Sequence, residues 1–333
     1  MSQMPACSSV TVGIIAYNEQ KYLPDLLNDL LDQTYPKEKT EVVLVDSCST
    51  DQTRRIMNDF YSRYCSVFYS IKVRDNSAMI QAAGWNVVIQ SASCDVILRI
   101  DAHARLDRLF VENCIRCLND GEFVCGGPRK NIIDDNTAWK RMLLDAEQAL
   151  FGSGFAEYRR GTEERKYVNS VFHGAYRREV FENVGLFNEA LVRTEDNELH
   201  YRIRQAGYRI CYDPNIKSYY QTRNTLKRML IQKYQNGFWI GKTLRICRGC
   251  ISLFHIVPLV FVLFLLASCI LAAFGLWQIL ALLGIVYGLF VTVSTCICLV
   301  KSKNPYDLLL PILFFLMHCC YGIGTFLGLL GIE

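Results

Sequence analysis

Hydrophobic residues divide the chain into two regions with different patterns. Up to about residue 250, short apolar runs alternate with polar turns and with segments whose apolar residues recur every three or four positions. After residue 250, long apolar stretches follow one another with almost no charge. The first pattern is typical of a globular domain of strands and helices, and the second is typical of membrane-spanning helices.

The first region predicts alternating strands and helices. Buried strands are expected at residues 10–16, 41–45, 67–73 and 94–101. Helices are expected around residues 54–60 and 78–90, and between the first two strands, where the apolar residues are Leu23, Leu26, Leu27 and Leu30. Because strands joined by helices form parallel sheets, we expect an α/β fold with a doubly wound mixed, mostly parallel sheet.

Three apolar stretches in the second region, residues 254–274, 279–300 and 308–330, predict a C-terminal bundle of three transmembrane helices. Each has at least the roughly 20 residues needed to cross the hydrocarbon core. Basic residues precede the first stretch and lie between the second and third. The positive-inside rule therefore predicts a multi-pass protein of the cell (inner) membrane, with its N-terminal domain cytoplasmic and its C-terminus outside. No cleaved signal peptide is expected.

A basic segment joins the two regions. Residues 217–248 contain eight basic residues and no acidic one. Within it, Leu226, Leu230, Tyr234 and Phe238 recur at every fourth position, which predicts an amphipathic helix lying on an anionic membrane surface. Membrane lipid is thus the expected partner, and nucleic acid is not. The expected division is a cytoplasmic domain at 1–222, an interfacial helix at 223–250 and the spanning helices at 251–333.

Charge and cysteine content refine this picture. All but two of the 36 basic residues, and all but two of the 32 acidic ones, precede residue 251. The 15 cysteines are scattered, and several lie in the apolar stretches, so free thiols are expected in a reducing cytoplasm. Two C-x-x-C pairs, at 114/117 and 247/250, have the spacing of zinc ligands. Neither has a partner pair nearby in sequence, which argues against structural zinc.

Candidate chemistry gathers where the predicted strands end. Glu19, Asp46 and Asp101 each follow a strand, and the carboxyl ends of parallel strands meet at one sheet edge, where ligands bind. Asp101 and His103, two residues apart, are positioned to bind one divalent cation, Mg²⁺ or Mn²⁺, that holds a diphosphate. In the simpler interpretation these carboxylates only cap turns. Neither a G-x-G-x-x-G turn nor a P-loop is present, which disfavours dinucleotide oxidoreductases and P-loop ATPases.

Two further groups of charged residues bear on this site. Arg74 and Arg99 are available to neutralise phosphate. A helix is expected to begin at Thr194, whose side chain is expected to cap it, and the two residues that follow are Glu195 and Asp196. Acidic residues in a first helical turn often only compensate the helix dipole. The functional alternative is a general base directed at the sheet edge.

Taken together, four motifs resemble family 2 glycosyltransferases of the GT-A fold, over residues 8–245. They are V-G-I-I-A-Y-N-E at 12–19, V-D-S-C-S-T-D at 45–51, D-A-H at 101–103, where the family has D-x-D, and T-E-D at 194–196. The segment I-D-A-H-A at 100–104 is similar to membrane-bound bacterial transferases that assemble succinoglycan-type exopolysaccharides.

The resemblance implies a role for each matching residue. Asp196 would be the catalytic base, and Asp101 and His103 the metal ligands. Glu195, His173 and Trp239 would contact the acceptor or support the site. The nucleotide sugar would be bound by Ala16, Tyr17, Glu19, Asp46, Asn76 and Asp101.

The implied activity is an inverting, metal-dependent transfer from a nucleotide diphosphate sugar, with a UDP-sugar favoured, to a polyprenyl-diphosphate-linked saccharide in exopolysaccharide or capsule synthesis. His103 replaces the usual second aspartate, and Ser47 stands where many members have another. The Q-x-x-R-W motif of processive synthases is not present. The alternatives are a polyprenyl-phosphate sugar synthase and a noncatalytic membrane subunit that binds nucleotide sugar.

Overall fold

The computed structural model describes residues 6–149, 151–152, 162–222 and 225–332. The chain folds into two compact units: residues 1–130 with 161–221, and residues 131–160 with 222–333. The described residues 131–149 and 151–152 thus group with the C-terminal helices.

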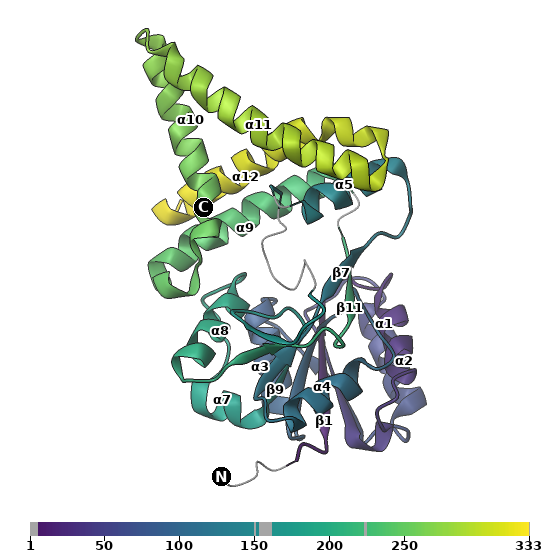
Figure 1. Cartoon of the computed structure of the whole chain (residues 1–333). Coiled ribbons are helices and arrows are strands. Elements are labelled where there is room, and N and C mark those ends of the chain that lie inside the picture. Colours follow the sequence, from purple (N-terminus) through teal and green to yellow (C-terminus); the bar gives the residue numbers. More distant parts are fainter. Residues whose placement is uncertain (1–5, 150, 153–161, 223–224, 333) are drawn as a thin grey trace. The chain divides into compact units, whose positions relative to one another are not determined.

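Within its described residues, the first unit holds an eight-stranded sheet with the order β3-β2-β1-β4-β9-β6-β10-β8 (Figure 1). Its strands are β1 (Val10–Ala16), β2 (Thr40–Asp46), β3 (Ser70–Asp75), β4 (Val96–Asp101), β6 (Val124–Gly126), β8 (Lys166–Val168), β9 (Gly174–Arg177) and β10 (Ile210–Tyr212). A smaller sheet has the order β5-β11-β7, formed by β5 (Ala104–Leu106), β11 (Ser218–Gln221) and β7 (Arg129–Ile132).

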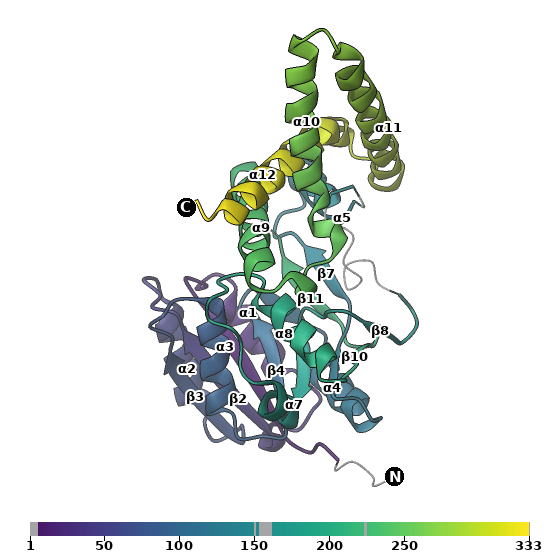
Figure 2. The same cartoon turned by 90° about the vertical axis from the view of Figure 1, so that its left-hand side faces the viewer.

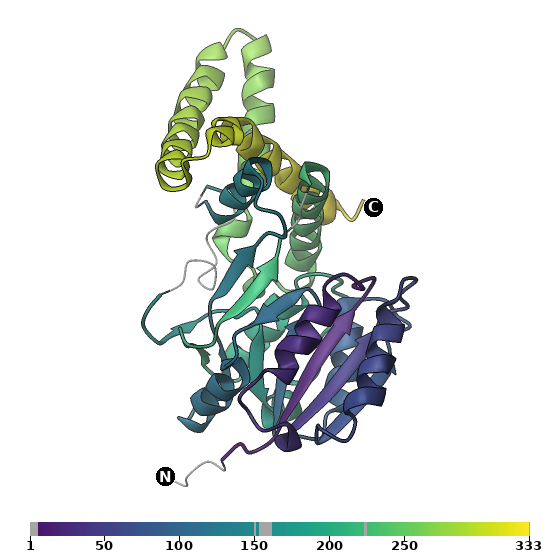
Figure 3. The same ribbon diagram turned by 90° about the vertical axis from the view of Figure 1, so that its right-hand side faces the viewer.

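The N-terminal half of the large sheet is parallel, because β1 pairs in parallel with both β2 and β4, and β2 pairs in parallel with β3. β9 then runs antiparallel between β4 and β6. Figure 3 shows the purple and blue strands side by side with helices of similar colour beside them. Every residue of β2 is buried, as expected for a strand covered on both faces. The predicted mixed, mostly parallel α/β sheet is confirmed.

Helices alternate with these strands. They are α1 (Leu23–Leu31), η1 (Lys37–Lys39), α2 (Thr53–Tyr64), α3 (Gln81–Ser91), α4 (Phe110–Asn119), α7 (Arg178–Val184) and α8 (Glu195–Gln205). The strand expected at residues 67–73 begins and ends later, as β3. Immediately before β3, the backbone N–H of Tyr69 donates to the carbonyls of Lys37 and Thr40.

The second unit is helical. It contains α5 (Ala138–Gln148), α9 (Leu226–Ile246), η2 (Arg248–Cys250), η3 (Leu253–His255), α10 (Val257–Ala273), α11 (Trp277–Ser302), η4 (Pro305–Leu309) and α12 (Leu310–Leu330). Among the described residues, three segments are long and apolar enough to cross a membrane: Leu253–Ala273, Trp277–Ser302 and Pro305–Leu330. They match the three predicted spans. α10 and α11 form a hairpin (Figure 2).

Glycines allow α9 and α12 to pack backbone to backbone. A Cβ at Gly237 would lie 2.0 Å from the carbonyl oxygen of Tyr321, and one at Gly241 would lie 2.3 Å from that of Thr325. From the other helix, a Cβ at Gly328 would lie 2.0 Å from the carbonyl oxygen of Phe238. This small-residue packing is typical of helices in membranes. The helix expected at the membrane surface therefore also has a glycine face that packs on a spanning helix.

Candidate active site

The ends of the parallel strands bring the predicted carboxylates to one edge of the sheet. The register pairs Ala16 of β1 with Asp46 of β2, and Ile15 of β1 with Asp101 of β4. Glu19 lies in the loop that follows β1. Asp46 and Asp101 are buried, whereas Tyr17 is half exposed. The expected convergence at the carboxyl edge is therefore present.

His103 is oriented by a carboxylate. Its Nδ1 lies 3.0 Å from Oε1 of Glu19, and its ring packs edge-on against Tyr220 with the ring centroids 4.8 Å apart. Burial by itself would lower the pKa of His103, but Tyr220, Glu19 and Asp101 outweigh it and raise the pKa to about 9. A histidine with this pKa is protonated at neutral pH, so a cation would bind at Nε2 only after that nitrogen loses its proton. The Glu19 contact at Nδ1 would then orient the ring, as in many metal-binding histidines.

Two buried atoms at this edge fit a cation. Among the described residues, His103 Nε2 and Asp101 Oδ1 are both buried without a hydrogen-bond partner. An imidazole nitrogen with a carboxylate oxygen suits Mn²⁺, and also Mg²⁺ when phosphate oxygens complete the shell. The described part of the chain has no group of three or more His, Cys, Asp or Glu side chains that could hold a metal. The remaining ligands would thus come from substrate and water.

Asp46 and Asn76 shape the loops at the same edge. The Asp46 carboxylate accepts the backbone N–H of Ser49 at 3.3 Å. Asn76 donates through Nδ2 to Ser47 Oγ and to the carbonyl of Ile80, both at 2.9 Å, and its backbone N–H donates to the Asp46 carbonyl. These bonds fix the loops after β2 and β3. The predicted role of Asn76 in nucleotide binding stays a prediction.

The loops around the site hold an unusual backbone conformation. Four non-glycine residues with positive φ lie in the loops after β1, β2 and β3 and immediately before α8: Asn18, Cys48, Met79 and Thr194. Such conformations cost of order 1–3 kcal/mol each and gather at functional sites. Thr194 is the N-cap residue of α8, but its side chain makes no capping hydrogen bond. The expected side-chain cap is wrong, because the left-handed turn (φ 69°) replaces the extended backbone of an ordinary cap.

The start of α8 is tied to β4 through Arg99. Nη2 of this buried arginine lies 3.8 Å from Oε1 of Glu195 and 4.0 Å from Oδ2 of Asp196. Arg99 and Asp101 alternate along β4 and so point to the same face of the sheet. Burial, together with the Asp196 carboxylate, raises the pKa of Glu195 although Arg99 opposes the shift. The Glu195 side chain is 3% exposed and that of Asp196 is 23% exposed, so Asp196 is the more accessible of the two.

Two residues at the site, Arg129 and Gln221, belong to no sequence motif. Arg129 is buried between two rings, with its guanidinium carbon 4.2 Å from the centroid of Phe172 and 4.3 Å from that of Tyr220. The backbone N–H of Gln221 donates to the carbonyl of His103 at 3.3 Å, and among the described residues its Nε2 is buried without a partner. Neither residue belongs to a motif, so only the fold reveals them. Arg74, expected near phosphate, is exposed.

His173 lies beside these groups. Its Nδ1 is 2.9 Å from Ser218 Oγ, and its Nε2 is buried and unpartnered within the described chain. Burial, with the positive charges of Arg129, Arg99 and His103, lowers the pKa of His173 to about 3 against the opposing effect of Asp101. This imidazole is therefore neutral at physiological pH. Trp239 belongs to the second unit, on α9, and its predicted role also stays a prediction.

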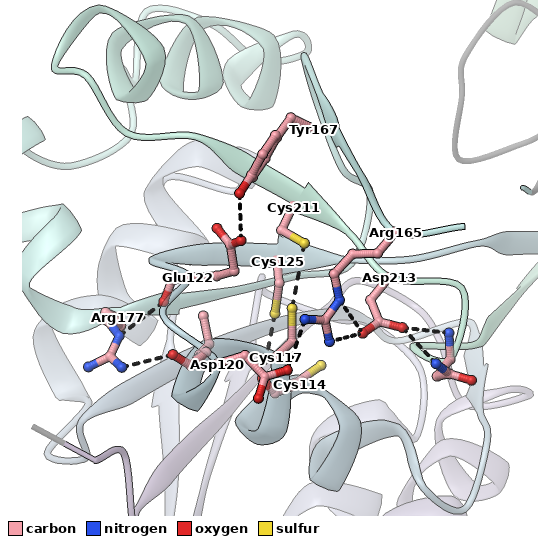
Figure 4. A network of polar contacts seen from close by, with 12 residues as sticks. Cys114, Cys117, Asp120, Glu122, Cys125, Arg165, Tyr167, Arg177, Cys211 and Asp213 are labelled. Carbon is pink, nitrogen blue, oxygen red and sulfur yellow. Dashed lines mark hydrogen bonds and ion pairs between the residues drawn. The ribbon is translucent and has the colours of Figure 1, made fainter. Parts of the chain in front are cut away.

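The cysteine pair at 114/117 gains neighbours in the fold. Figure 4 shows Cys117 of α4 close to Cys125 of β6 and Cys211 of β10. The Sγ atoms of Cys117 and Cys211 are 3.7 Å apart, and Cys125 Sγ lies 3.6 Å from the carbonyl oxygen of Cys114. Burial raises the pKa of the Cys125 thiol, as expected for an unreactive thiol. All fifteen cysteines are free.

The parallel sheet, the carboxylates at its edge and the acidic start of α8 together define a glycosyltransferase of the GT-A type. The chain belongs to glycosyl transferase family 2, whose family model matches residues 11–185. It is therefore a family 2 glycosyltransferase with three apolar helices at its C-terminal end.

Two curated relatives match nearly the whole chain. A Methanococcus voltae protein is 28% identical over 96% of this chain and 97% of its own length. Its name is dolichyl N-acetyl-alpha-D-glucosaminyl phosphate 3-beta-D-2,3-diacetamido-2,3-dideoxy-beta-D-glucuronosyltransferase. Succinoglycan biosynthesis protein ExoA of Rhizobium meliloti is 26% identical over 98% of this chain and 97% of its own length.

A solved structure supports the fold. The mannosyltransferase PcManGT from Pyrobaculum calidifontis, in complex with GDP-Man and Mn²⁺, matches with a TM-score of 0.60. It is 17% identical, over 96% of this chain and 86% of its own. At this identity the likeness concerns the fold alone.

Proposed function

We propose that this protein is an inverting glycosyltransferase of the cell membrane. It transfers one sugar from a nucleotide diphosphate sugar, with a UDP-sugar favoured, to a polyprenyl-diphosphate-linked saccharide at the cytoplasmic face. The names of the two relatives, one acting on a dolichyl-linked sugar and one in succinoglycan biosynthesis, support a lipid-linked acceptor and a role in exopolysaccharide or capsule assembly.

One observation carries the proposal. Asp101 Oδ1 and His103 Nε2 are buried without partners among the described residues, and Glu19 orients the imidazole from behind. Leaving a buried polar atom unpaired costs about 1–3 kcal/mol, so such a pair is expected to have a ligand in the working protein. A divalent cation bound there would stabilise the charge that develops on a leaving diphosphate.

The remaining steps belong to the chain's own residues. Asp196 accepts the proton of the acceptor hydroxyl as that oxygen bonds to the anomeric carbon of the donor, and the bond from that carbon to the diphosphate oxygen breaks. Attack from the face opposite the leaving group inverts the anomeric configuration. Arg99 on β4 places a positive charge 4.0 Å from the Asp196 carboxylate. The Arg129 guanidinium and the Gln221 amide supply donors suited to phosphate oxygens.

The test uses the purified full-length protein with a panel of nucleotide sugars and a lipid-linked saccharide. Transfer is expected with one donor, to stop with EDTA and to return with Mn²⁺ or Mg²⁺. The double variant Asp101→Ala, His103→Ala is expected to lose transfer, while Asp59→Asn, at an exposed position on α2, retains it. Full activity of the double variant in chelator would contradict the proposal.

A further inference from the structure

A cavity of about 420 Å³ lies within the second unit, among α9, α10, α11 and α12. Its volume is in the range of about 300–1,000 Å³ found for small-molecule sites. Its walls are mostly aromatic and aliphatic, including Phe151, Phe261, Tyr287 and Phe290. Three of the four helices around it belong to the candidate membrane spans, so an occupant would enter from the bilayer.

The rings around the cavity form an ordered wall. Phe261 stacks on Tyr287 with centroids 4.6 Å apart, and Phe151 stacks on Phe290 with centroids 6.1 Å apart. His318 packs edge-on against Phe151 at 4.8 Å. The wall therefore offers broad aromatic faces, which favour planar or branched apolar groups.

Three of the polar side chains that line the cavity, Lys233, Tyr287 and His318, have partners. His318 Nδ1 lies 3.0 Å from the Tyr287 hydroxyl, and its Nε2 lies 2.7 Å from the carbonyl oxygen of Phe151. Lys233 forms a buried ion pair with Glu147, with Nζ 3.0 Å from Oε1. Because these groups are satisfied, the cavity favours an apolar ligand over water.

The basic residues of α9 indicate that the apolar ligand carries an anionic group. Besides Lys233, whose charge is paired with Glu147, α9 has four basic residues and no acidic one: Lys227, Arg228, Lys242 and Arg245. A helix of this composition attracts an anionic head group at the membrane surface. The cavity and the basic helix together fit an apolar chain with a phosphate at one end.

We infer that this cavity binds the isoprene units nearest the phosphate of the lipid-linked acceptor, an inference that rests on the proposed function. Methyl branches and double bonds make a prenyl chain wider than a straight acyl chain and give it flat faces that pack on aromatic rings. The cavity thereby holds the acceptor by its lipid rather than by its sugar, and it selects a prenyl chain over the acyl chains of bulk phospholipid.

Binding is tested directly with the full-length protein and a farnesyl phosphate that carries a diazirine. Irradiation followed by mass spectrometry is expected to place adducts on peptides of α10, α11 and α12. Unlabelled polyprenyl phosphate should abolish the labelling, and phosphatidylglycerol at the same concentration should not. Equal competition by phosphatidylglycerol would make the cavity a bulk-lipid site and overturn the inference.

Variants on α11 locate the binding. Val286→Trp fills the cavity from a lining position, whereas Leu289→Trp places the same ring at an exposed position outside the lining. Val286→Trp is expected to lower labelling and to raise the KM for the lipid-linked acceptor about tenfold, equivalent to about 1.4 kcal/mol. Leu289→Trp should change neither. Leu283→Phe, a smaller addition to the same wall, should give an intermediate effect if Val286→Trp does not fold.

The two proposals fail in different ways. If no sugar is transferred with any donor but the probe still labels the cavity, the proposed function fails and the prenyl site stands as a lipid site. If transfer occurs and Val286→Trp folds with unchanged labelling and an unchanged KM, the cavity does not bind the acceptor.

Discussion

The strand-edge site and the cavity of the helical unit differ in whether their buried polar atoms have hydrogen-bond partners. At the strand edge, Asp101 Oδ1, His103 Nε2 and His173 Nε2 are buried without partners among the described residues. Around the cavity, His318 uses both ring nitrogens, and Lys233 is paired with Glu147. Because unpaired buried polar atoms are costly, the first site is built for a charged ligand and the second for an apolar one. The strand-edge site thus suits the sugar phosphate of the proposed reaction, and the cavity suits the lipid.

The largest expected effect tests the polar site. Asp196→Asn keeps the shape of the side chain and removes its basicity, so transfer should fall by about 10²–10⁴-fold while donor affinity stays near that of the native protein. Transfer rates measured beside donor-binding calorimetry decide it, with Asp59→Asn as the control. If Asp196 serves only the helix dipole, turnover will be nearly normal. A lipid-phosphate acceptor, which needs no base, would also be insensitive to this change.

A second prediction concerns the residue behind the metal ligand. Glu19→Gln removes the carboxylate that orients His103, and loss of such a partner typically weakens metal affinity about 10–100-fold. Titration of transfer with Mn²⁺ should show the higher metal requirement, with activity recovering at saturating Mn²⁺. Glu38→Gln, an exposed position, is the matched control. An unchanged Mn²⁺ requirement would separate Glu19 from the metal site.

A third prediction concerns the stability of the helical unit, which substitutions far from the polar site in sequence should lower. Gly237→Leu forces a side chain against the backbone of Tyr321, and overpacking of this kind costs about 1–3 kcal/mol or more. A Cβ at Gly284 on α11 would have no neighbouring atom within 4 Å, so Gly284→Leu is the control. In detergent, the thermal unfolding temperature should fall for Gly237→Leu and stay unchanged for Gly284→Leu. Equal unfolding temperatures of the two variants would refute the close packing of α9 and α12.

The smallest effect depends on pH. Burial and the nearby Asp307 raise the pKa of Asp145, on α5, to about 6. A raised carboxyl pKa means that the folded state binds the proton more tightly. The ionised Asp145 carboxylate therefore destabilises the folded protein fully at pH values above about 6 and has no effect below about pH 4, where the carboxyl is protonated in both the folded and the unfolded state. Because Asp145 is only partly buried, solvent screening leaves less than the full effect of this shift, and Asp145→Asn should stabilise the protein by about 1 kcal/mol at pH 7.5 and leave it unchanged at pH 4. Equal shifts in unfolding temperature at both pH values would exclude this linkage.

Features that depend on neighbouring residues in the sequence could be predicted from it. The alternation of apolar runs predicted the parallel strands, and the strand ends predicted that Asp46 and Asp101 lie at the same sheet edge, where they flank β1. The lengths of the apolar stretches predicted the three spans. These features depend on periodicity and composition, which the sequence displays directly.

Features that depend on distant contacts were missed. Arg129 turns between Phe172 and Tyr220 because three separate strands and loops come together, and no motif marks it. The glycines of α9 and α12 have helical spacing in each segment, but their mutual contact depends on which helices pair. Thr194 was expected to cap by its side chain, and its left-handed backbone is set by the loop before α8.

The glycine contact between α9 and α12 also affects how the chain is made. α9 is synthesised well before α12, yet its Gly237 and Gly241 face is completed only by the last helix. During synthesis this face stays uncovered until residues 310–330 leave the ribosome. A chain that ends before α12 therefore leaves the glycine face of α9 without the helix that covers it.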